Sequence, residues 1–136
     1  MQRVYRISII FKNMFLQLAH TKLNVYQQTK LLTIECYKVT KLLPSDEKFG
    51  MVSQLRRAAL SVHLNLAEGA SRKSLAERKR YYEISRGSLI EVDTAIGIAF
   101  ELQYITSTEI QVLGEVIINT FKLLSGLIAQ VGQTQK

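Results

Sequence analysis

Residues 74–104 of the chain read SLAERKRYYEISRGSLIEVDTAIGIAFELQY, and this stretch decides the fold class. Ser74 and Glu77 form the capping-box pattern that opens a helix. Beyond them, apolar and small residues recur in steps of three and four, which places them on one helical face. That face consists of Tyr81, Ile84, Ser88, Val92, Ala95, Ala99 and Leu102. The spacing therefore predicts one long amphipathic helix.

Two further helices are predicted on the N-terminal side of this stretch. One is expected over residues 18–43 and ends before Pro44, because proline cannot continue a helix. Its stripe comprises Leu23, Tyr26, Lys30, Ile34, Tyr37 and Lys41, thickened by Leu31, Leu32, Val39 and Leu42. The other is expected over residues 51–68 and stops at Gly69. Its seam comprises Val52, Leu55, Ala59, Val62 and Leu66.

A fourth helix is predicted on the C-terminal side, where Thr106 and Glu109 form a second capping box. Its seam comprises Ile110, Leu113, Ile117, Phe121, Leu124, Ile128 and Val131. Four amphipathic helices with short connections predict an all-α, antiparallel up-down four-helix bundle.

The composition supports a single helical domain. The chain has 136 residues, of which 47% are hydrophobic and 21% charged, with only seven glycines and one proline. So few glycines and prolines, the residues that favour turns, argue against a many-stranded sheet. Residues 18–136 are predicted to form the bundle, and residues 1–17 an N-terminal extension. For this extension two alternatives stay open, namely a start at Met14 or a basic arm.

The helices carry more apolar surface than one seam requires. Leu60, Leu64 and Ala67 lie away from the seam of the second helix. Val112, Val116, Leu123 and Leu127 form a second row on the last helix. Exposed apolar rows mark interfaces, so self-association is expected; the alternative is a thick, asymmetric core.

Positive charge is concentrated in one region. The formal net charge is +7, and residues 56–86 hold eight basic residues against three acidic ones. Arg72, Lys73, Arg78, Lys79 and Arg80 surround the connection between the second and third helices, and Arg86 follows in the third helix. Such clusters contact phosphate oxygens without reading base sequence. We therefore predict that these six residues bind nucleic acid; the alternative is a solvated face.

The sequence gives little support for a catalytic, cofactor-binding or metal-binding site. His63 and Glu68 are five positions apart on one helix and do not converge, so His63 is interpreted as a partly buried or interface polar residue. Cys36 is interpreted as a small buried hydrophobe. No signal peptide is expected, because the apolar stretch at residues 7–11 is short. No membrane span is expected, because no run reaches about 18 uninterrupted apolar residues. A cytoplasmic protein without catalysis, cofactor, metal or membrane partner is expected.

Two other features predict helix contacts. Gly87, Gly97, Gly114 and Gly126 interrupt helical patterns, and each is expected to mark a close helix approach. On the third helix, Glu91 is either a semi-buried acid that pairs with Arg57 of the second helix or a plain surface glutamate.

The run from Phe49 to Ile105 resembles the small bacterial four-helix bundle proteins called 23S rRNA intervening sequence proteins. The resemblance rests on a glutamine with paired arginines, an Asn-x-Ala-Glu-Gly stop, an Arg-Lys-Ser entry and a Gly-Ser-x-x-Glu segment. These are Gln54, Arg56, Arg57, Asn65, Ala67, Glu68, Gly69, Arg72, Lys73, Ser74, Gly87, Ser88 and Glu91. His63 stands where the family commonly has proline.

This resemblance implies a homopentamer with a basic surface that handles RNA or a nucleic-acid enzyme, as in the similar accessory proteins of diversity-generating reverse transcriptases. It does not imply catalysis. The leading hypothesis is a homo-oligomer that binds RNA or DNA. The alternative is a scaffold that docks another protein through its apolar rows.

Overall fold

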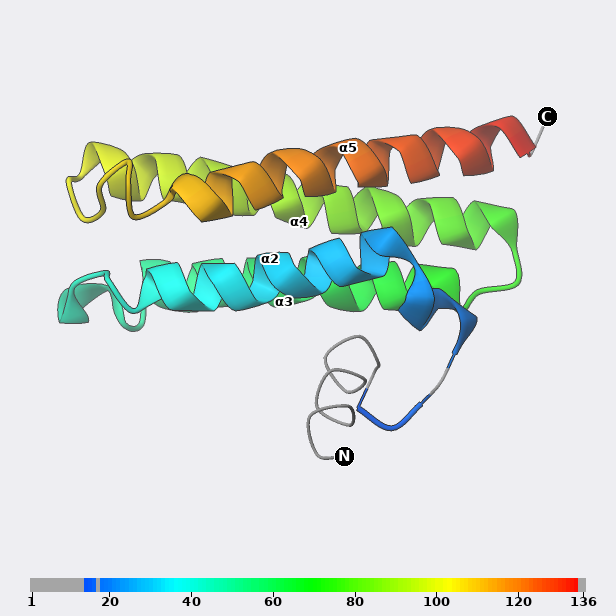
Figure 1. Ribbon diagram of the computed structural model, residues 1–136, viewed down its shortest axis with the longest axis horizontal. Coiled ribbons are helices and arrows are strands. Elements are labelled where there is room, and N and C mark those ends of the chain that lie inside the picture. Colours follow the sequence, from blue (N-terminus) through cyan, green and yellow to red (C-terminus); the bar gives the residue numbers. More distant parts are fainter. Residues whose placement is uncertain (1–13, 17, 135–136) are drawn as a thin grey trace, which may run out of the picture.

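The computed structural model describes residues 14–16 and 18–134, and that part of the chain is helical with connecting turns (Figure 1). Its long helices are α2 (Asn24–Thr40), α3 (Met51–Ala70), α4 (Leu75–Glu101) and α5 (Gln111–Thr134). Two short 3-10 helices, η1 (Ala19–Lys22) and η2 (Ser45–Glu47), precede α2 and α3. The extension expected over residues 1–17 lies almost wholly outside the described residues.

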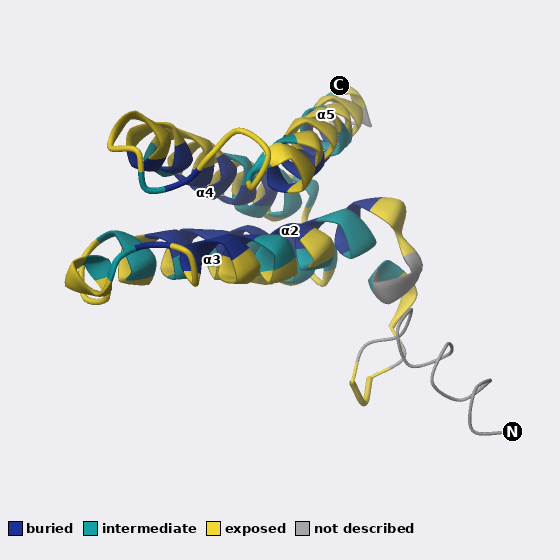
Figure 2. Cartoon of the chain, turned by 60° about the vertical axis from the view of Figure 1, so that its left-hand side comes forward, coloured by how far each residue is buried: buried dark blue, intermediate teal, exposed yellow. Residues whose placement is uncertain are grey.

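The four long helices form an up-down bundle. Each helix packs against the next one along the chain, and contact between α2 and α5 closes the bundle. Figure 2 shows α2 with α3 as one layer and α4 with α5 as the other, with buried residues on the faces that meet. The all-α four-helix architecture predicted from the sequence is confirmed.

The seam of α3 is the part of the core that the periodicity predicted best. Leu55, Ala59, Val62 and Leu66 are almost completely buried, and Val52 is partly buried against them. The other fully buried large apolar side chains come from the remaining three helices, and they are Leu32, Leu89, Val92, Leu113 and Leu124. The bundle core thus runs through all four helices.

The predicted face of α4 is rotated from the observed one. Ser88, Val92 and Ala99 are buried as predicted, but Ile84 and Leu102 are exposed. The missing core positions are filled by Tyr82, Ser85, Leu89 and Ile96. Because almost every turn of α4 offers apolar side chains on two sides, the spacing alone did not fix which side faces inward.

The stripe predicted for the first helix is wrong at several positions. Leu23, Leu31, Ile34, Tyr37 and Leu42 are exposed. The buried face of α2 consists of Val25, Tyr26, Thr29, Leu32, Cys36, Val39 and Thr40. Two threonines on this face satisfy their hydroxyls on the backbone of their own helix, Thr29 on the Tyr26 carbonyl and Thr40 on the Tyr37 carbonyl. A core face with this polarity does not stand out in a search for apolar periodicity.

The second row predicted on the last helix is also corrected. Val116 is buried, and Leu123 and Leu127 pack against the core; only Val112 of that row is exposed. Leu113, Ile117, Leu124, Ile128 and Val131 are buried as predicted. By length and composition, residues Gln111–Gln133 could cross a membrane, with a mean hydropathy of 1.6. In this fold that helix packs against α2 and α4.

The helix ends follow the predicted caps with shifts. The Ser74 hydroxyl accepts a hydrogen bond from the Glu77 amide (3.3 Å), so this cap is formed at the start of α4. Thr106 and Glu109 also form their reciprocal box, with bonds of 2.9 and 3.2 Å, but they close a turn, and α5 begins only at Gln111. Helix α2 ends at Thr40, four residues before Pro44.

The glycines play different roles from those predicted. Gly69 does not stop its helix, since α3 continues through Ala70. A Cβ atom on Gly69 would lie 2.9 Å from Tyr81 Cβ and 2.9 Å from Tyr82 Cε1, so its missing side chain lets α3 and α4 approach closely. The prediction of close approach is wrong for Gly87, Gly97, Gly114 and Gly126, because a Cβ atom there would meet nothing within 4 Å in the single chain.

Candidate nucleic-acid interface

The structure gathers five of the six predicted cations at one end of the bundle. Arg72 and Lys73 lie in the turn between α3 and α4, and Arg78, Lys79 and Arg80 lie in the first turns of α4. We call these five residues the basic end. In Figure 1 it lies at the green turn, beside the last turns of α5 and close to η1.

Two arginines of the basic end are committed to building the turn. Arg72 forms an ion pair with Glu68, donates to the Tyr81 hydroxyl (3.2 Å) and stacks over the Tyr81 ring. Tyr81, and then Glu68, raise the pKa of the Arg72 guanidinium. Arg78 donates from Nε to the Arg72 carbonyl (2.5 Å), which ties the start of α4 to the turn.

The other three cations are more available to a ligand. Lys73 and Arg80 are exposed, and neither belongs to an ion pair within the described residues. Lys79 lies 3.9 Å from Glu83, which is a loose pair on the helix surface. The side chains best placed for phosphate contacts are therefore Lys73, Lys79 and Arg80.

Arg86 does not belong to this group. It follows Arg78 by eight residues, which corresponds to about 12 Å along a helix. Its Nη1 atom donates to the Ser125 hydroxyl (3.1 Å), and its guanidinium lies over the Phe121 ring at 5.9 Å. Arg86 therefore joins α4 to α5.

The predicted semi-buried pair of Arg57 and Glu91 is absent from the single chain. Both residues are exposed, and no ion pair joins them in the part of the chain that the structure describes. Polar contact between α3 and α4 comes instead from Ser61 and Ser88, whose hydroxyl oxygens are 2.9 Å apart. In the single chain, Glu91 is a surface glutamate, the alternative left open by its spacing.

His63 and Cys36 take the structural roles interpreted from the sequence. His63 is partly buried between α3 and α2, with Nδ1 2.8 Å from the Thr29 hydroxyl and its ring 4.6 Å from that of Tyr26. Burial, followed by the charges of Lys30 and His20, lowers its pKa to about 4. Cys36 is fully buried, and burial raises the pKa of its thiol to about 11. Neither group has the pKa of a base or nucleophile poised near neutral pH.

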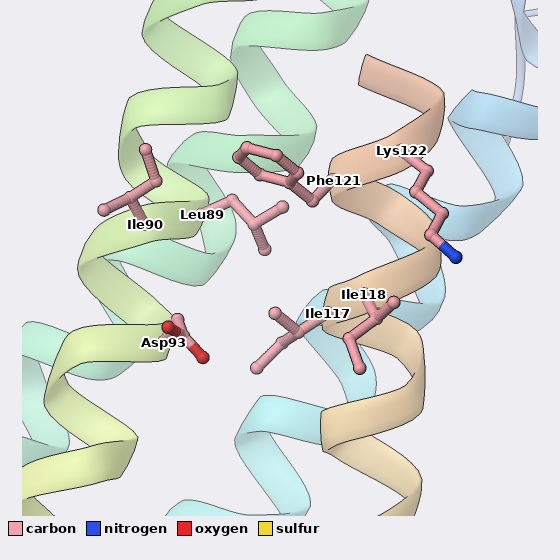
Figure 3. A pocket seen from close by; sticks show the side chains of 7 residues that line it. All are labelled: Leu89, Ile90, Asp93, Ile117, Ile118, Phe121 and Lys122. Atoms are coloured by element: carbon pink, nitrogen blue, oxygen red, sulfur yellow. The ribbon is translucent and has the colours of Figure 1, made fainter. Parts of the chain in front are cut away.

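An apolar groove between α4 and α5 was not found from the sequence. It has a volume of about 320 Å³, and Figure 3 shows Phe121, Leu89 and Ile117 facing its interior. Its rim carries Ile90 and Ile118, which are 50% and 56% exposed. Ile118 lies outside the three-four spacing of the α5 seam, so the sequence pattern did not predict the groove. The groove depends on how α5 is rotated against α4, which the spacing does not give. On α3, Leu60 and Leu64 of the predicted second row are exposed, whereas Ala67 packs against the core.

Comparisons with known proteins agree with this architecture. A family model described as 23S rRNA-intervening sequence protein matches residues 21–126. A crystal structure at 1.70 Å resolution of a protein of unknown function, from the S23 ribosomal protein family of Bacteroides thetaiotaomicron, aligns with a TM-score of 0.71. The alignment has 21% sequence identity and covers 76% of this chain and 97% of that one, so it shows a shared fold. No curated protein matches the sequence.

Proposed function

Because the chain belongs to the 23S rRNA-intervening sequence protein family, we propose that it is a non-catalytic, cytoplasmic homo-oligomer that binds RNA or DNA through its basic end. The observation that carries the proposal is the placement of Lys73, Lys79 and Arg80 around one turn, exposed or only loosely paired. Exposed cations of this kind bind phosphate groups and release counterions. Binding is therefore electrostatic and weakly selective for sequence.

Assembly would multiply these contacts. The resemblance in sequence favours a pentamer, and the exposed side chains of Leu60 and Leu64 on α3 supply apolar surface that association would cover. A ring would repeat the basic end on each subunit, so that avidity raises the affinity for a long nucleic acid. Size-exclusion chromatography with light scattering is expected to report a pentamer. A clean monomer at micromolar concentration would contradict this part of the proposal.

The nucleic-acid proposal is tested by removing the three available cations together. The variant Lys73→Gln, Lys79→Gln, Arg80→Gln is expected to lose binding of structured RNA and duplex DNA. It keeps its fold because Arg72 and Arg78, which hold the turn, are unchanged. For the parent, log affinity falls by about 0.7 to 0.9 per contacted phosphate for each tenfold rise in salt. Filter binding between low and physiological salt measures both effects.

A matched control removes the same charge from the opposite end of the bundle. Lys38, Lys41 and Lys48 are exposed around the connection between α2 and α3. Their replacement by glutamine is expected to leave most of the binding in place. Equal loss in both triple variants would show that net charge, and not the basic end, governs binding. A parent that binds neither nucleic acid at low salt overturns the proposal.

The groove between α4 and α5 favours a second candidate function, the docking of another protein. Its apolar walls and exposed rim are typical of a surface that a helix or apolar segment of a partner covers. In that case Ile118→Lys removes binding of the partner, whereas the triple variant at the basic end retains it. Affinity measurements with both variants therefore separate the two functions.

A further inference from the structure

A pocket opens at the basic end, where α3, α4 and α5 meet η1 and the N-cap residue of α2. Its volume is about 440 Å³, which lies in the range of small-ligand sites. Leu23, Leu75 and Leu127 form apolar walls, and Tyr82 lies at the same site. The polar groups of the lining are His20, Arg78 and Gln130.

The charge of this pocket is unbalanced. Arg78 forms no ion pair with any described residue, and none of the described residues that line the pocket is acidic. Its Nε atom is used by the Arg72 carbonyl, which fixes the guanidinium at the pocket and leaves its two terminal nitrogens to donate elsewhere. An arginine held in this way, beside apolar walls, recognises a phosphate or carboxylate by paired hydrogen bonds.

The surroundings of the pocket favour a phosphate that belongs to a longer anionic chain. Lys79 lies close to the last turn of α5, since its Nζ atom would be 4.0 Å from a Cβ atom on Gly132. Lys73 and Arg80 are exposed on the same turn of the bundle. A ligand whose end enters the pocket would thus lie beside Lys79, at the edge that α4 forms with the last turn of α5.

We propose that this pocket binds the terminal nucleotide of a nucleic acid, with its terminal phosphate on Arg78 and its base and sugar against the apolar walls. The inference rests on the proposed function and deepens it, because it distinguishes an end of the strand from its interior. A terminal phosphate carries nearly two negative charges and three free oxygens, whereas an internal phosphodiester carries one charge. The pocket therefore selects strand ends, and the outer cations of the basic end, Lys73, Lys79 and Arg80, hold the adjoining backbone.

The test uses the full chain and unlabelled single-stranded oligonucleotides of one sequence as competitors in fluorescence anisotropy. They carry a 5′-phosphate, a 3′-phosphate or hydroxyls at both ends, and a free mononucleotide forms a fourth arm. One of the two phosphorylated strands is expected to compete about tenfold better than the hydroxyl-ended strand. A factor of about ten corresponds to one charge-assisted hydrogen bond. The free mononucleotide is expected to bind more weakly, because it reaches none of the outer cations.

Two variants assign the preference to the pocket. Arg78→Lys keeps the charge but loses the paired donors, and Ala19→Trp fills the pocket from an exposed position of η1. Both are expected to remove the preference for a phosphorylated end and to retain binding of the hydroxyl-ended strand. The control Arg80→Gln is expected to weaken all strands equally.

The outcomes separate this inference from the function on which it rests. Equal affinity for all strand ends in the parent overturns the pocket and leaves nucleic-acid binding standing. A preference that survives Ala19→Trp also overturns it, whatever Arg78→Lys does to the fold. If the free mononucleotide binds more tightly than any strand, the ligand of the pocket is a soluble nucleotide and not a strand end. A parent that binds no strand overturns both proposals.

Discussion

Helix α3 contacts its two neighbours through different chemistry. Toward α4 the contact is made by small residues: Gly69 lies against Tyr81 and Tyr82, and the Ser85 hydroxyl donates to the Val62 carbonyl (2.6 Å). Small side chains let the two backbones approach closely. This contact is therefore sensitive to added volume.

Toward α2 the contact is made by longer polar side chains. The Thr33 hydroxyl donates to the Ala59 carbonyl (3.1 Å), Arg56 donates to the Thr40 hydroxyl (2.9 Å), and His63 lies against Thr29. Hydrogen bonds cross both contacts, so the two sides differ in what would disturb them: added volume on the α4 side, and protonation of His63 on the α2 side.

The largest effect is expected from the core that both contacts enclose. Leu66 is 1% exposed, so Leu66→Ala removes buried apolar volume and leaves a cavity. The free energy of unfolding is expected to fall by about 2–5 kcal/mol. Leu64, two positions before it, is 55% exposed, and Leu64→Ala should change stability by no more than about 0.5 kcal/mol in the single chain. Urea denaturation of both variants measures the difference.

The next effect tests the close approach of α3 and α4. Gly69→Ala places a Cβ atom against Tyr81 Cβ, which is fixed near the backbone, and a net loss of about 1–3 kcal/mol is expected from overpacking. Gly97→Ala is the matched control, because its Cβ atom meets nothing within 4 Å and alanine favours a helix by up to about 1 kcal/mol. A Gly69→Ala variant as stable as the parent would show that the helices separate at no cost.

The contact between α3 and α2 is expected to weaken in acid. The pKa of His63 is lowered from 6.5 to about 4, mainly by burial, so the unfolded chain takes up this proton at a higher pH than the folded one. The contribution is complete above pH 6.5, is lost as the pH falls toward 4 and does not change further below that value. The full shift corresponds to about 3 kcal/mol, which partial exposure screens to about 1–2 kcal/mol.

Denaturation at several pH values measures this loss. His63→Gln removes the titrating group, so the slope between pH 6.5 and 4 should flatten. His20→Gln removes the other histidine and is expected to retain most of the slope. The same slope in the parent and in His63→Gln would assign the acid sensitivity to other groups.

The two sides of α3 also explain what the sequence could predict. The seam of α3 was predicted correctly because it is apolar at every turn, from Leu55 to Leu66. The inner face of α2 was predicted only in part. Tyr26, Leu32 and Val39 are buried as predicted, but Thr29 and Thr40 also lie fully inside, while Ile34 and Tyr37 lie outside. Hydroxyls that bond to a neighbouring backbone are indistinguishable in sequence from surface hydroxyls.

The candidate site was predictable to the same limited extent. Chain proximity alone places Arg72, Lys73 and residues 78–80 at one end, and the structure has them there. It could not show that Arg72 and Arg78 bind the turn itself, or that Arg86 reaches Ser125 on α5. These contacts depend on how the helices are rotated and on which carbonyls the turn leaves unpaired. Residue spacing predicts neither.

The smallest effect concerns the outer edge of the contact between α3 and α4, where Arg57 and Glu91 lie exposed. A double-mutant cycle with Arg57→Ala and Glu91→Gln isolates their interaction from their separate contributions. In a single chain the coupling is expected to be under about 1 kcal/mol, as for exposed pairs. Lys79 and Glu83, 3.9 Å apart on the surface of α4, supply the reference cycle.

If assembly buries Arg57 and Glu91 together, removal of either partner would instead cost about 3 kcal/mol or more, because an unpaired charge would stay buried. That cost would decrease on dilution as the subunits separate, whereas a coupling within one chain is independent of concentration. Thermal melts of the four proteins at two concentrations therefore decide whether this edge is a free surface or a contact between copies.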